Sequence, residues 1–221
     1  FQNKKISGKF SRLKKIQIKV CQSSDKVIVP SKFLAKVVEQ WGVKDKNING
    51  IYNGTDFKPL AMEKEMARRE IGISGNIILS AGRLVPWKGF KMLIKIMPEL
   101  LKDDQFVRLV IVGDGPERPR IEALALRLGV QARFTGVVPH EDLPRMLAAM
   151  DVGVVLARPD EPFHYSPLKV AEYLAAGLPV IAPRVDQLTD RLDDERSAVF
   201  FEPGDVSGLA AILRSVGTDP Q

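Results

Sequence analysis

Apolar residues along the chain recur with two spacings, one typical of buried strands and the other typical of helices. Short apolar runs rich in Val and Ile, bounded by turn residues, predict strands within residues 26–31, 48–56, 76–84, 107–116, 132–136, 151–157, 179–183 and 198–205. Apolar positions three and four residues apart predict helices within residues 31–42, 63–73, 89–102, 117–129, 140–150, 168–177 and 205–216. Strands that alternate with helices form βαβ units, so we expect an α/β fold. The strands lack polar alternation, which indicates a parallel sheet with helices on both faces.

Residues 53–64 interrupt this alternation, because they combine an Asn-Gly turn and a proline with no hydrophobic period. We interpret this segment as a hinge or linker that separates residues 1–55 from residues 56–221. Residues 1–55 are too short to bury a core of their own. We therefore expect them to be the tail of an incomplete domain, and we expect the second domain to be truncated at its end.

Composition excludes several classes of protein. Of the 221 residues, 45% are hydrophobic and 27% are charged, as in ordinary globular proteins. No apolar run approaches the roughly 20 residues of a membrane-spanning helix, and no secretory signal pattern is visible. Cys21 is the single cysteine, which excludes an internal disulfide and suits the reducing cytoplasm. With only two histidines besides, the sequence offers no metal-binding constellation.

The net charge of +6 has its excess at the N-terminus. The first 19 residues contain no Asp or Glu, and their basic residues are Lys4, Lys5, Lys9, Arg12, Lys14, Lys15 and Lys19. One interpretation is a solvated helix or connector. The other is attraction to an anionic partner, such as a membrane surface or a phosphorylated substrate. Nucleic acid is not expected, because aromatic residues are sparse and do not alternate with the basic ones.

Two loops after predicted strands carry residues suited to phosphate. Arg83 and Lys88 share the loop at residues 81–89, where they are either surface cations in water or a pair that binds a phosphate or diphosphate. Gly113 and Gly115 either form a common turn or let a ligand approach the backbone. In open parallel sheets, ligands lie beyond the carboxyl ends of the strands, where both loops belong.

A third segment follows the strand at residues 151–157 and leads into a helix that is mostly apolar. Lys169 and Glu172 are the charged residues of this helix. A solvated lysine and a partly exposed glutamate with a polar neighbour would account for them. Their place at the carboxyl end of a strand also fits a ligand site.

Taken in order, these segments resemble the donor-binding half of family 4 glycosyltransferases, retaining enzymes of the GT-B group that use nucleotide sugars. The similarity covers about residues 24–215 and rests on seven motifs, each modest by itself. They are VIVPSKFLAKVV, INGIYNGTDFKPL, LSAGRLVPWKGF, LVIVGDGP, ARFTGVVPHEDLPRML, VAEYLAAGLPVIAP and FFEPGD. The resemblance implies a Rossmann-like C-terminal domain of the GT-B type, a nucleotide-sugar donor as substrate and no cofactor.

The resemblance also implies roles for single residues. Arg83 and Lys88 would hold the diphosphate and neutralise its charge as it leaves, and Glu172 would accept hydrogen bonds from the ribose hydroxyls. The N-terminus of the helix, with Ser166, Leu168 and Lys169, would face the phosphates. The backbone at Val137 and Val138 would contact the base. Gly113 and Gly115 would let the donor approach the chain.

The sequence departs from the family where the sugar would bind. The family usually has a glutamate for the sugar hydroxyls eight residues before the position of Glu172, and here that residue is His164. Glu161 has the usual chemistry but lies eleven residues before Glu172. Spacing favours His164 and chemistry favours Glu161, so both stay candidates. Pro167 also removes a backbone N–H where the family often has glycine, and Lys169 would supply the lost positive charge.

Transfer of a sugar to an acceptor is the function that the resemblance implies. A module that binds nucleotide sugars without catalysis, or a GT-B nucleotide-sugar epimerase, is the alternative. The expected partners are the donor, an acceptor such as a glycan or lipid-linked glycan, and a membrane surface that the basic N-terminus contacts. The expected location is the cytoplasm. Because most of the acceptor domain is missing in this interpretation, we expect slow turnover or none.

Overall fold

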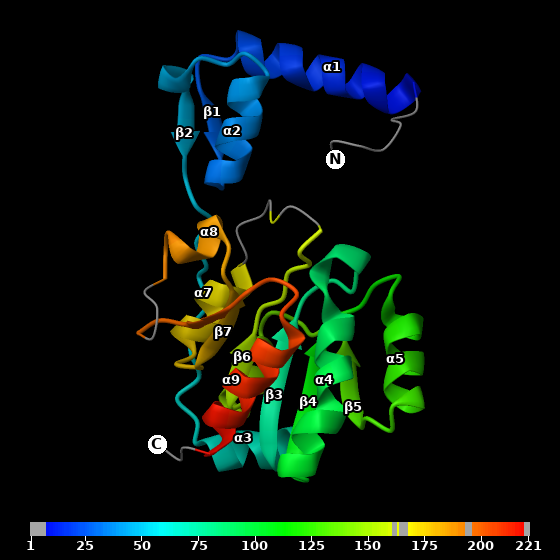
Figure 1. Ribbon diagram of the computed structural model, residues 1–221. Coiled ribbons are helices and arrows are strands. Elements are labelled where there is room, and N and C mark those ends of the chain that lie inside the picture. The colour runs from blue at the N-terminus through cyan, green and yellow to red at the C-terminus, as the bar shows by residue number, and fades with distance from the viewer. Residues whose placement is uncertain (1–7, 161–162, 164–167, 193–195, 219–221) are drawn as a thin grey trace. The chain divides into compact units, whose positions relative to one another are not determined.

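The computed structural model describes residues 8–160, 163, 168–192 and 196–218 (Figure 1). The described residues up to Asn53 form one compact unit. Those from Gly54 to Asp160 and from Leu168 onward form a second.

The first unit is a small αβαβ arrangement. Its elements are α1 (Gly8–Ser23), β1 (Val27–Val29), α2 (Lys32–Gln40), the 3-10 turn η1 (Asp45–Asn47) and β2 (Ile48–Gly50). The two strands pair in parallel, with Val27 opposite Ile48. At the beginning of α2 the Ser31 hydroxyl accepts a hydrogen bond from the Leu34 N–H at 3.2 Å, as the predicted cap requires. The strand predicted from residue 48 is shorter than expected, since it ends at Gly50.

The second unit is built on a six-stranded parallel sheet, which confirms the predicted α/β class. Its strands are β3 (Asn76–Ala81), β4 (Val107–Val112), β5 (Ala132–Gly136), β6 (Val152–Val154), β7 (Val180–Pro183) and β8 (Val199–Phe201). Its helical elements are α3 (Lys64–Ile71), η2 (Pro86–Lys88), α4 (Phe90–Asp103), α5 (Arg118–Arg127), α6 (Leu143–Ala148), α7 (Leu168–Ala175), α8 (Asp186–Thr189) and α9 (Val206–Thr218). The short helix α8 was not predicted from the sequence.

The strands lie in the order β5-β4-β3-β6-β7-β8 (Figure 1). The sheet therefore grows from β3 to β5 on one side and continues from β6 to β8 on the other. Right-handed crossovers place α4 and α5 on one face of such a sheet and α7 on the opposite face. The order of the strands reverses between β3 and β6, which are direct neighbours, with Ile78 opposite Val152.

Alternate side chains of the central strands enter the cores on the two faces. Ile78, Leu109 and Ile111 belong to a cluster with apolar residues of α4, α5 and α9. Ile77 and Leu79, the neighbours of Ile78, are outside this cluster and are fully buried as well. Burial on both faces explains why the strands lack polar alternation in the sequence.

Candidate functional site

The reversal of strand order gives the sheet one place where neighbouring loops diverge. Chains that leave β3 and β6 turn to opposite faces, and ligands of open α/β sheets bind in the crevice between such loops. The loop after β3 contains Arg83 and Lys88. The segment after β6 leads to α7, which contains Lys169 and Glu172. The topology therefore brings two segments more than 60 residues apart in the sequence to one edge of the sheet.

The loop between β3 and α4 is fixed by its own backbone and by one apolar anchor. The Gly82 N–H donates to the Val112 carbonyl at 2.8 Å, and the Leu84 N–H donates to the Asp114 carbonyl at 2.8 Å. The Leu84 side chain is fully buried. Between these anchors Arg83 is exposed, and Lys88 at the end of η2 is half-buried. The two predicted cations thus lie on a well-anchored loop.

Gly113 and Gly115 allow this anchoring, because the two loop backbones nearly touch. A Cβ at Gly113, where φ is 125°, would stand 2.2 Å from the Gly82 carbonyl oxygen. A Cβ at Gly115 would stand 2.4 Å from the Leu84 carbonyl oxygen. The Gly113 N–H donates to the Gly136 carbonyl at 2.8 Å, so it is already engaged. The structure gives these glycines a packing role, and their predicted approach to a donor stays a prediction.

Lys169 is the most unusual residue at this edge. The residue is only 8% exposed, and its Nζ lies 5.9 Å from the centre of the Phe90 ring. Burial, followed by the nearby charge of Lys88, lowers the pKa of Lys169 to about 7. None of the ion pairs among the described residues involves Lys169. The interpretation of Lys169 as a solvated side chain is therefore wrong.

The charge of Lys88 acts on Lys169, and Lys88 is also partly removed from water. A Cβ at Gly82 would stand 3.2 Å from the Lys88 Nζ, so this ammonium group rests against the loop backbone. Burial lowers the pKa of Lys88. Two ammonium groups that repel each other in a partly desolvated place are stabilised by an anion between them. The arrangement suits a ligand with at least one phosphate group.

Glu172 lies one turn after Lys169 on α7. Its carboxylate is half-buried, and burial raises its pKa, while the nearby His140 opposes this effect. The His140 imidazole in turn lies 3.7 Å from Asp56, measured from Nε2 to Oδ1. A partly desolvated carboxylate is suited to accept hydrogen bonds from hydroxyl groups.

Tyr173 positions α7 against the sheet, and sequence reasoning missed this role. Its side chain is fully buried, and its hydroxyl oxygen accepts a hydrogen bond from the Ala81 N–H at 2.8 Å. The ring packs on β6, where a Cβ at Gly153 would stand 2.4 Å from the Tyr173 Cδ2. Burial is the main cause that raises the pKa of the Tyr173 phenol, so it stays protonated. In the sequence, a tyrosine among the apolar residues of a predicted helix indicates only that the side chain is buried, and it does not predict the hydrogen bond to β3.

The other predicted residues are not brought together with these cations by any described contact. Val137 follows β5 and is 79% exposed, and Val138 beside it is half-buried. Leu168 begins α7 and is exposed. Glu161, His164, Ser166 and Pro167 lie outside the described residues.

Among residues 8–160, 163, 168–192 and 196–218, no group of three or more His, Cys, Asp and Glu side chains could hold a metal ion. No helix in these ranges is both long enough and apolar enough to cross a bilayer.

Comparison with known families gives a match over most of the second unit. The sequence model of the family described as "Glycosyl transferases group 1" matches residues 75–219, more than half of the chain. Glycogen synthase of Mycobacterium tuberculosis is 29% identical over 221 residues, which cover 97% of this chain and 51% of that protein. An uncharacterized glycosyltransferase of Methanocaldococcus jannaschii is 32% identical over 197 residues, which cover 85% of this chain and 49% of that protein. The chain thus spans about half the length of these relatives.

Solved structures share the fold. HepE of Anabaena, in complex with UDP and glucose, superposes with a TM-score of 0.80 at 23% identity, covering 93% of this chain and 57% of that one. Sucrose-phosphate synthase of Thermosynechococcus elongatus gives a TM-score of 0.79 at 27% identity, covering 100% of this chain and 55% of that one.

Proposed function

Because the chain belongs to the group 1 glycosyl transferases, we propose that it binds a nucleotide-sugar donor and transfers the sugar to an acceptor. One observation carries the proposal. The loop after β3 and the helix after β6 bring Lys88 and the buried Lys169 together at the reversal of strand order. Two desolvated ammonium groups at this place favour a diphosphate ligand.

In this proposal the cations act on the leaving group. Arg83, Lys88 and Lys169 bind the diphosphate and stabilise the negative charge that develops as the bond between sugar and phosphate breaks. Glu172 accepts hydrogen bonds from the ribose, and the backbone at Val137 and Val138 contacts the base. The sugar hydroxyls are bound by Glu161 or His164.

The proposal extends to the subfamily and to the arrangement of the domains. We propose that the enzyme belongs to family 4 and retains the anomeric configuration, which the motifs around Arg83 and Glu172 support. We further propose that residues 1–55 belong to an acceptor-binding domain and residues 56–221 to the donor-binding domain. Nuclear magnetic resonance of the anomeric proton in the first-formed product tests retention, because an inverted product would contradict it.

Donor turnover tests the function itself. The chain is incubated with UDP-glucose and with GDP-mannose, with candidate glycan acceptors, and release of nucleoside diphosphate is measured by mass spectrometry. Release that depends on an acceptor supports transfer. Tight binding of these nucleotide sugars without any release would instead support a binding module, and conversion of one sugar into its epimer would support an epimerase.

The Arg83→Ala and Lys88→Ala variants are each expected to weaken UDP binding about tenfold or more, because a charge-assisted hydrogen bond contributes about 1.5–3 kcal/mol. UMP binding should fall less, because UMP lacks the second phosphate. Calorimetric titration of both nucleotides measures the difference. The melting temperature of Arg83→Ala should stay nearly unchanged, since Arg83 is exposed.

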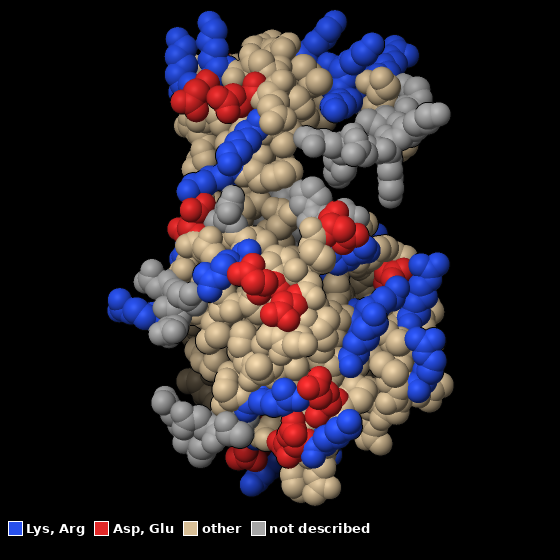
Figure 2. All heavy atoms as spheres, viewed as in Figure 1, with Lys and Arg blue, Asp and Glu red and all other residues tan. Residues whose placement is uncertain are grey.

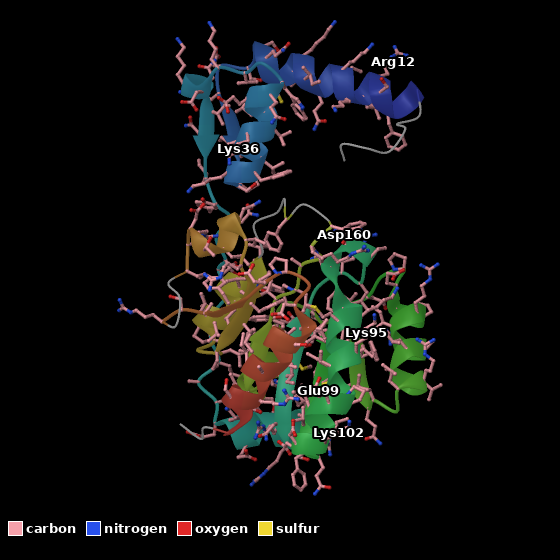
Figure 3. The ribbon with its side chains drawn as sticks, viewed as in Figure 1. Arg12, Lys36, Lys95, Glu99, Lys102 and Asp160 are labelled. Carbon is pink, nitrogen blue, oxygen red and sulfur yellow. The ribbon has the colours of Figure 1, made fainter. Side chains whose placement is uncertain are left out.

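Lys95 provides the matched control for this pair. It is an exposed cation on α4 (Figure 3), and Lys95→Ala should leave the affinity for UDP unchanged. If Arg83→Ala and Lys88→Ala reduced the affinity for UMP and UDP equally, these residues would not be the contacts of the second phosphate.

We propose that helix α1 contacts an anionic membrane surface on the cytoplasmic side. Lys and Arg side chains gather over α1 (Figure 2), and the helix contains no acidic residue. Its apolar positions three or four residues apart are all at least half exposed, namely Phe10, Leu13, Ile16 and Val20. This combination of a basic helix and an exposed apolar stripe is typical of helices that lie at a bilayer surface.

The charge-reversing double variant Lys14→Glu/Lys15→Glu is expected to abolish sedimentation of the chain with vesicles that contain phosphatidylglycerol. Each cation near an anionic surface contributes about 1 kcal/mol. Lys36→Glu, on α2 (Figure 3), changes charge outside α1 and should leave sedimentation nearly intact. Equal binding of the wild type to vesicles of neutral lipid alone would contradict the electrostatic part of the proposal.

A further inference from the structure

A cavity lies at the end of the sheet opposite the loop that carries Arg83 and the helix that carries Lys169. Its volume is about 600 Å³, and α3, the turn after α3 and the first residues of β4 and β5 line it. Because all strands are parallel, the amino ends of β4 and β5 lie at the sheet edge opposite the carboxyl ends that precede Arg83 and Lys169. The two sites are therefore separate.

Arginines dominate the charged lining of this cavity. Arg68 and Arg69 come from α3, Arg108 from β4 and Arg133 from β5, whereas Glu65 is the single acidic lining residue. We name this cavity, with its four arginines, the arginine pocket.

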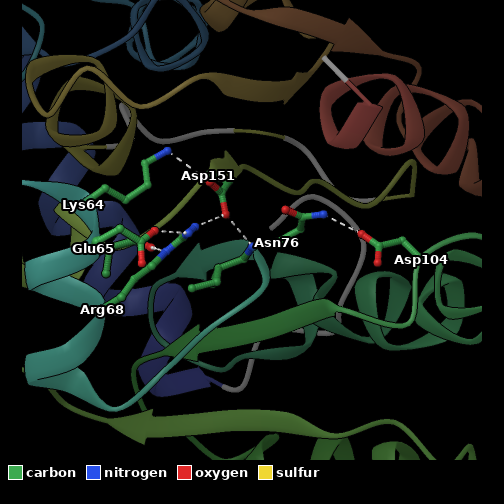
Figure 4. A network of polar contacts seen from close by, with 8 residues as sticks. Lys64, Glu65, Arg68, Asn76, Asp104 and Asp151 are labelled. Atoms are coloured by element: carbon green, nitrogen blue, oxygen red, sulfur yellow. Dashed lines mark hydrogen bonds and ion pairs between the residues drawn. The ribbon is translucent and has the colours of Figure 1, made fainter. Parts of the chain in front are cut away.

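Arg68 is a structural member of the pocket wall. Its guanidinium contacts Asp151 at 2.5 Å, Glu65 at 3.0 Å and the Ala149 carbonyl at 3.1 Å (Figure 4). Asp151 also accepts hydrogen bonds from Lys64 at 3.0 Å and from the Ile77 N–H at 2.7 Å. The charge of Glu65 is therefore offset by Arg68, which leaves the positive charges of Arg69, Arg108 and Arg133.

Arg108 and Arg133 are held in place by carbonyl groups that carry no full charge. The Arg108 Nη1 donates to the carbonyls of Gln105 at 2.8 Å and Val107 at 3.0 Å. The Arg133 Nη1 donates to the carbonyl of Ile71, the last residue of α3, at 2.5 Å. A guanidinium has five N–H donors. The hydrogen bonds found among the described residues use only the Nη1 group of each of these arginines, so both side chains are positioned while their Nε and Nη2 donors stay available.

We propose that the arginine pocket binds a small phosphate monoester, such as a sugar phosphate. Because Glu65 is paired with Arg68, the like charges of Arg69, Arg108 and Arg133 repel each other, and an anion between them removes this repulsion. Guanidinium groups match the geometry of phosphate oxygens with paired N–H donors. The volume lies within the range of small-molecule sites, about 300–1,000 Å³, and leaves room for the organic part of the ligand.

Glucose 6-phosphate, titrated by calorimetry into the chain saturated with UDP, tests this proposal. Saturation with UDP blocks the diphosphate site. Any saturable heat of glucose 6-phosphate binding that remains therefore comes from the arginine pocket. Glucose is titrated in parallel and should give no binding. Inorganic phosphate should compete with glucose 6-phosphate, because the phosphate group makes the main contacts.

Arg69→Gln is the decisive variant, because Arg69 is an exposed residue of α3 and makes none of the anchoring contacts above. It should reduce the affinity for glucose 6-phosphate about tenfold without changing the melting temperature or the affinity for UDP. Arg108→Gln should have a similar effect on glucose 6-phosphate. Arg127→Gln, an exposed arginine of α5 outside the pocket, is the matched control and should change nothing.

Absence of saturable binding of glucose 6-phosphate to the UDP-saturated chain would overturn the proposal. So would binding that is reduced equally by Arg69→Gln and Arg127→Gln, because the effect would then come from net charge alone. If UDP did not bind at all, the titration would be made on the chain alone, and the pocket would be judged by the same variants, independently of the proposed function.

Discussion

Replacing Lys169 with methionine is expected to weaken UDP binding roughly 10- to 100-fold at neutral pH and, at the same time, to raise the melting temperature. The affinity falls because the diphosphate loses a charge-assisted hydrogen bond of about 1.5–3 kcal/mol. The stability rises because a lysine that is only 8% exposed as a residue is replaced by an apolar residue of similar length. Opposite changes in affinity and stability distinguish a ligand-binding residue from a structural one.

The same residue makes the wild type depend on pH in a defined way. The pKa of Lys169 is about 7 in the folded chain and 10.5 in the reference state. Below about pH 7, Lys169 is protonated in both the folded and the unfolded chain. The whole cost of burying its charge is then subtracted from the folding stability. As pH rises from about 7 to 10.5, the unfolded chain binds more protons than the folded one, so this residue adds stability in that interval.

Binding of the diphosphate has the opposite dependence, because the bound anion favours the ammonium form of Lys169. The affinity for UDP should fall as pH rises above about 7, by at most tenfold per pH unit for one proton. Among the described residues, the charge of Lys88 acts on Lys169, and Glu172 and Tyr173 are titratable groups on the same helix. Lys88 also has a lowered pKa, so the affinity of the Lys169→Met variant for UDP should still depend on pH, but more weakly than in the wild type. Calorimetry at several pH values above 7 avoids the range in which histidines titrate. The same slope in wild type and Lys169→Met would contradict this assignment.

Gly113→Ala is expected to destabilise the chain by about 3 kcal/mol or more. Overpacking costs about 1–3 kcal/mol, and a residue other than glycine at φ 125° adds strain of similar size. The atom that the new methyl group would meet is the Gly82 carbonyl oxygen, part of the backbone, so no side chain can move aside. Chemical denaturation measures the loss of stability.

Gly177→Ala is the matched control, because Gly177 has a positive φ of 72° with no atom near its missing Cβ. This variant should lose only the conformational part, about 1 kcal/mol. Because Gly113 faces the loop of Arg83, any folded Gly113→Ala protein should also bind UDP more weakly than Gly177→Ala does. Equal loss of stability in both variants would show that the loops move apart easily.

The alternation of strands and helices could be predicted from the sequence because it depends on local spacing. The predicted segments at residues 76–84, 107–116 and 132–136 correspond to β3, β4 and β5. The segment at residues 151–157 gave a strand of only three residues, β6; Val155 still donates its N–H to the Ile181 carbonyl at 2.8 Å, and Leu156 and Ala157 are buried beyond the strand. An apolar run in the sequence indicates which residues are buried, and burial here extends beyond the strand. The predicted segment is therefore longer than the observed strand.

Local patterns could not predict which residues of the site lie against one another, because these contacts join distant segments; only the family resemblance grouped Lys88 with Lys169. Lys88 and Lys169 are 81 residues apart in the sequence, and each of them alone resembles an ordinary surface lysine. The close approach of Gly113 to Gly82 depends on the pairing of β3 with β4. The arginine pocket combines α3, β4 and β5, and no local pattern marks its four arginines as neighbours.

The hydrogen bond of Tyr173 with the end of β3 has a consequence for how the sequence can vary. Tyr173, which lies within helix α7, attaches this helix to the sheet through the Ala81 N–H and the surface of Gly153. The preceding segment can therefore gain or lose residues while Lys169 and Glu172 keep their places beside the β3 loop. Under the proposed function, such a change of length is what would bring Glu161, eleven residues before Glu172 instead of the usual eight, to the sugar. If the proposed function holds, the residues that bind the sugar can therefore vary through changes of segment length without moving the residues that bind the diphosphate.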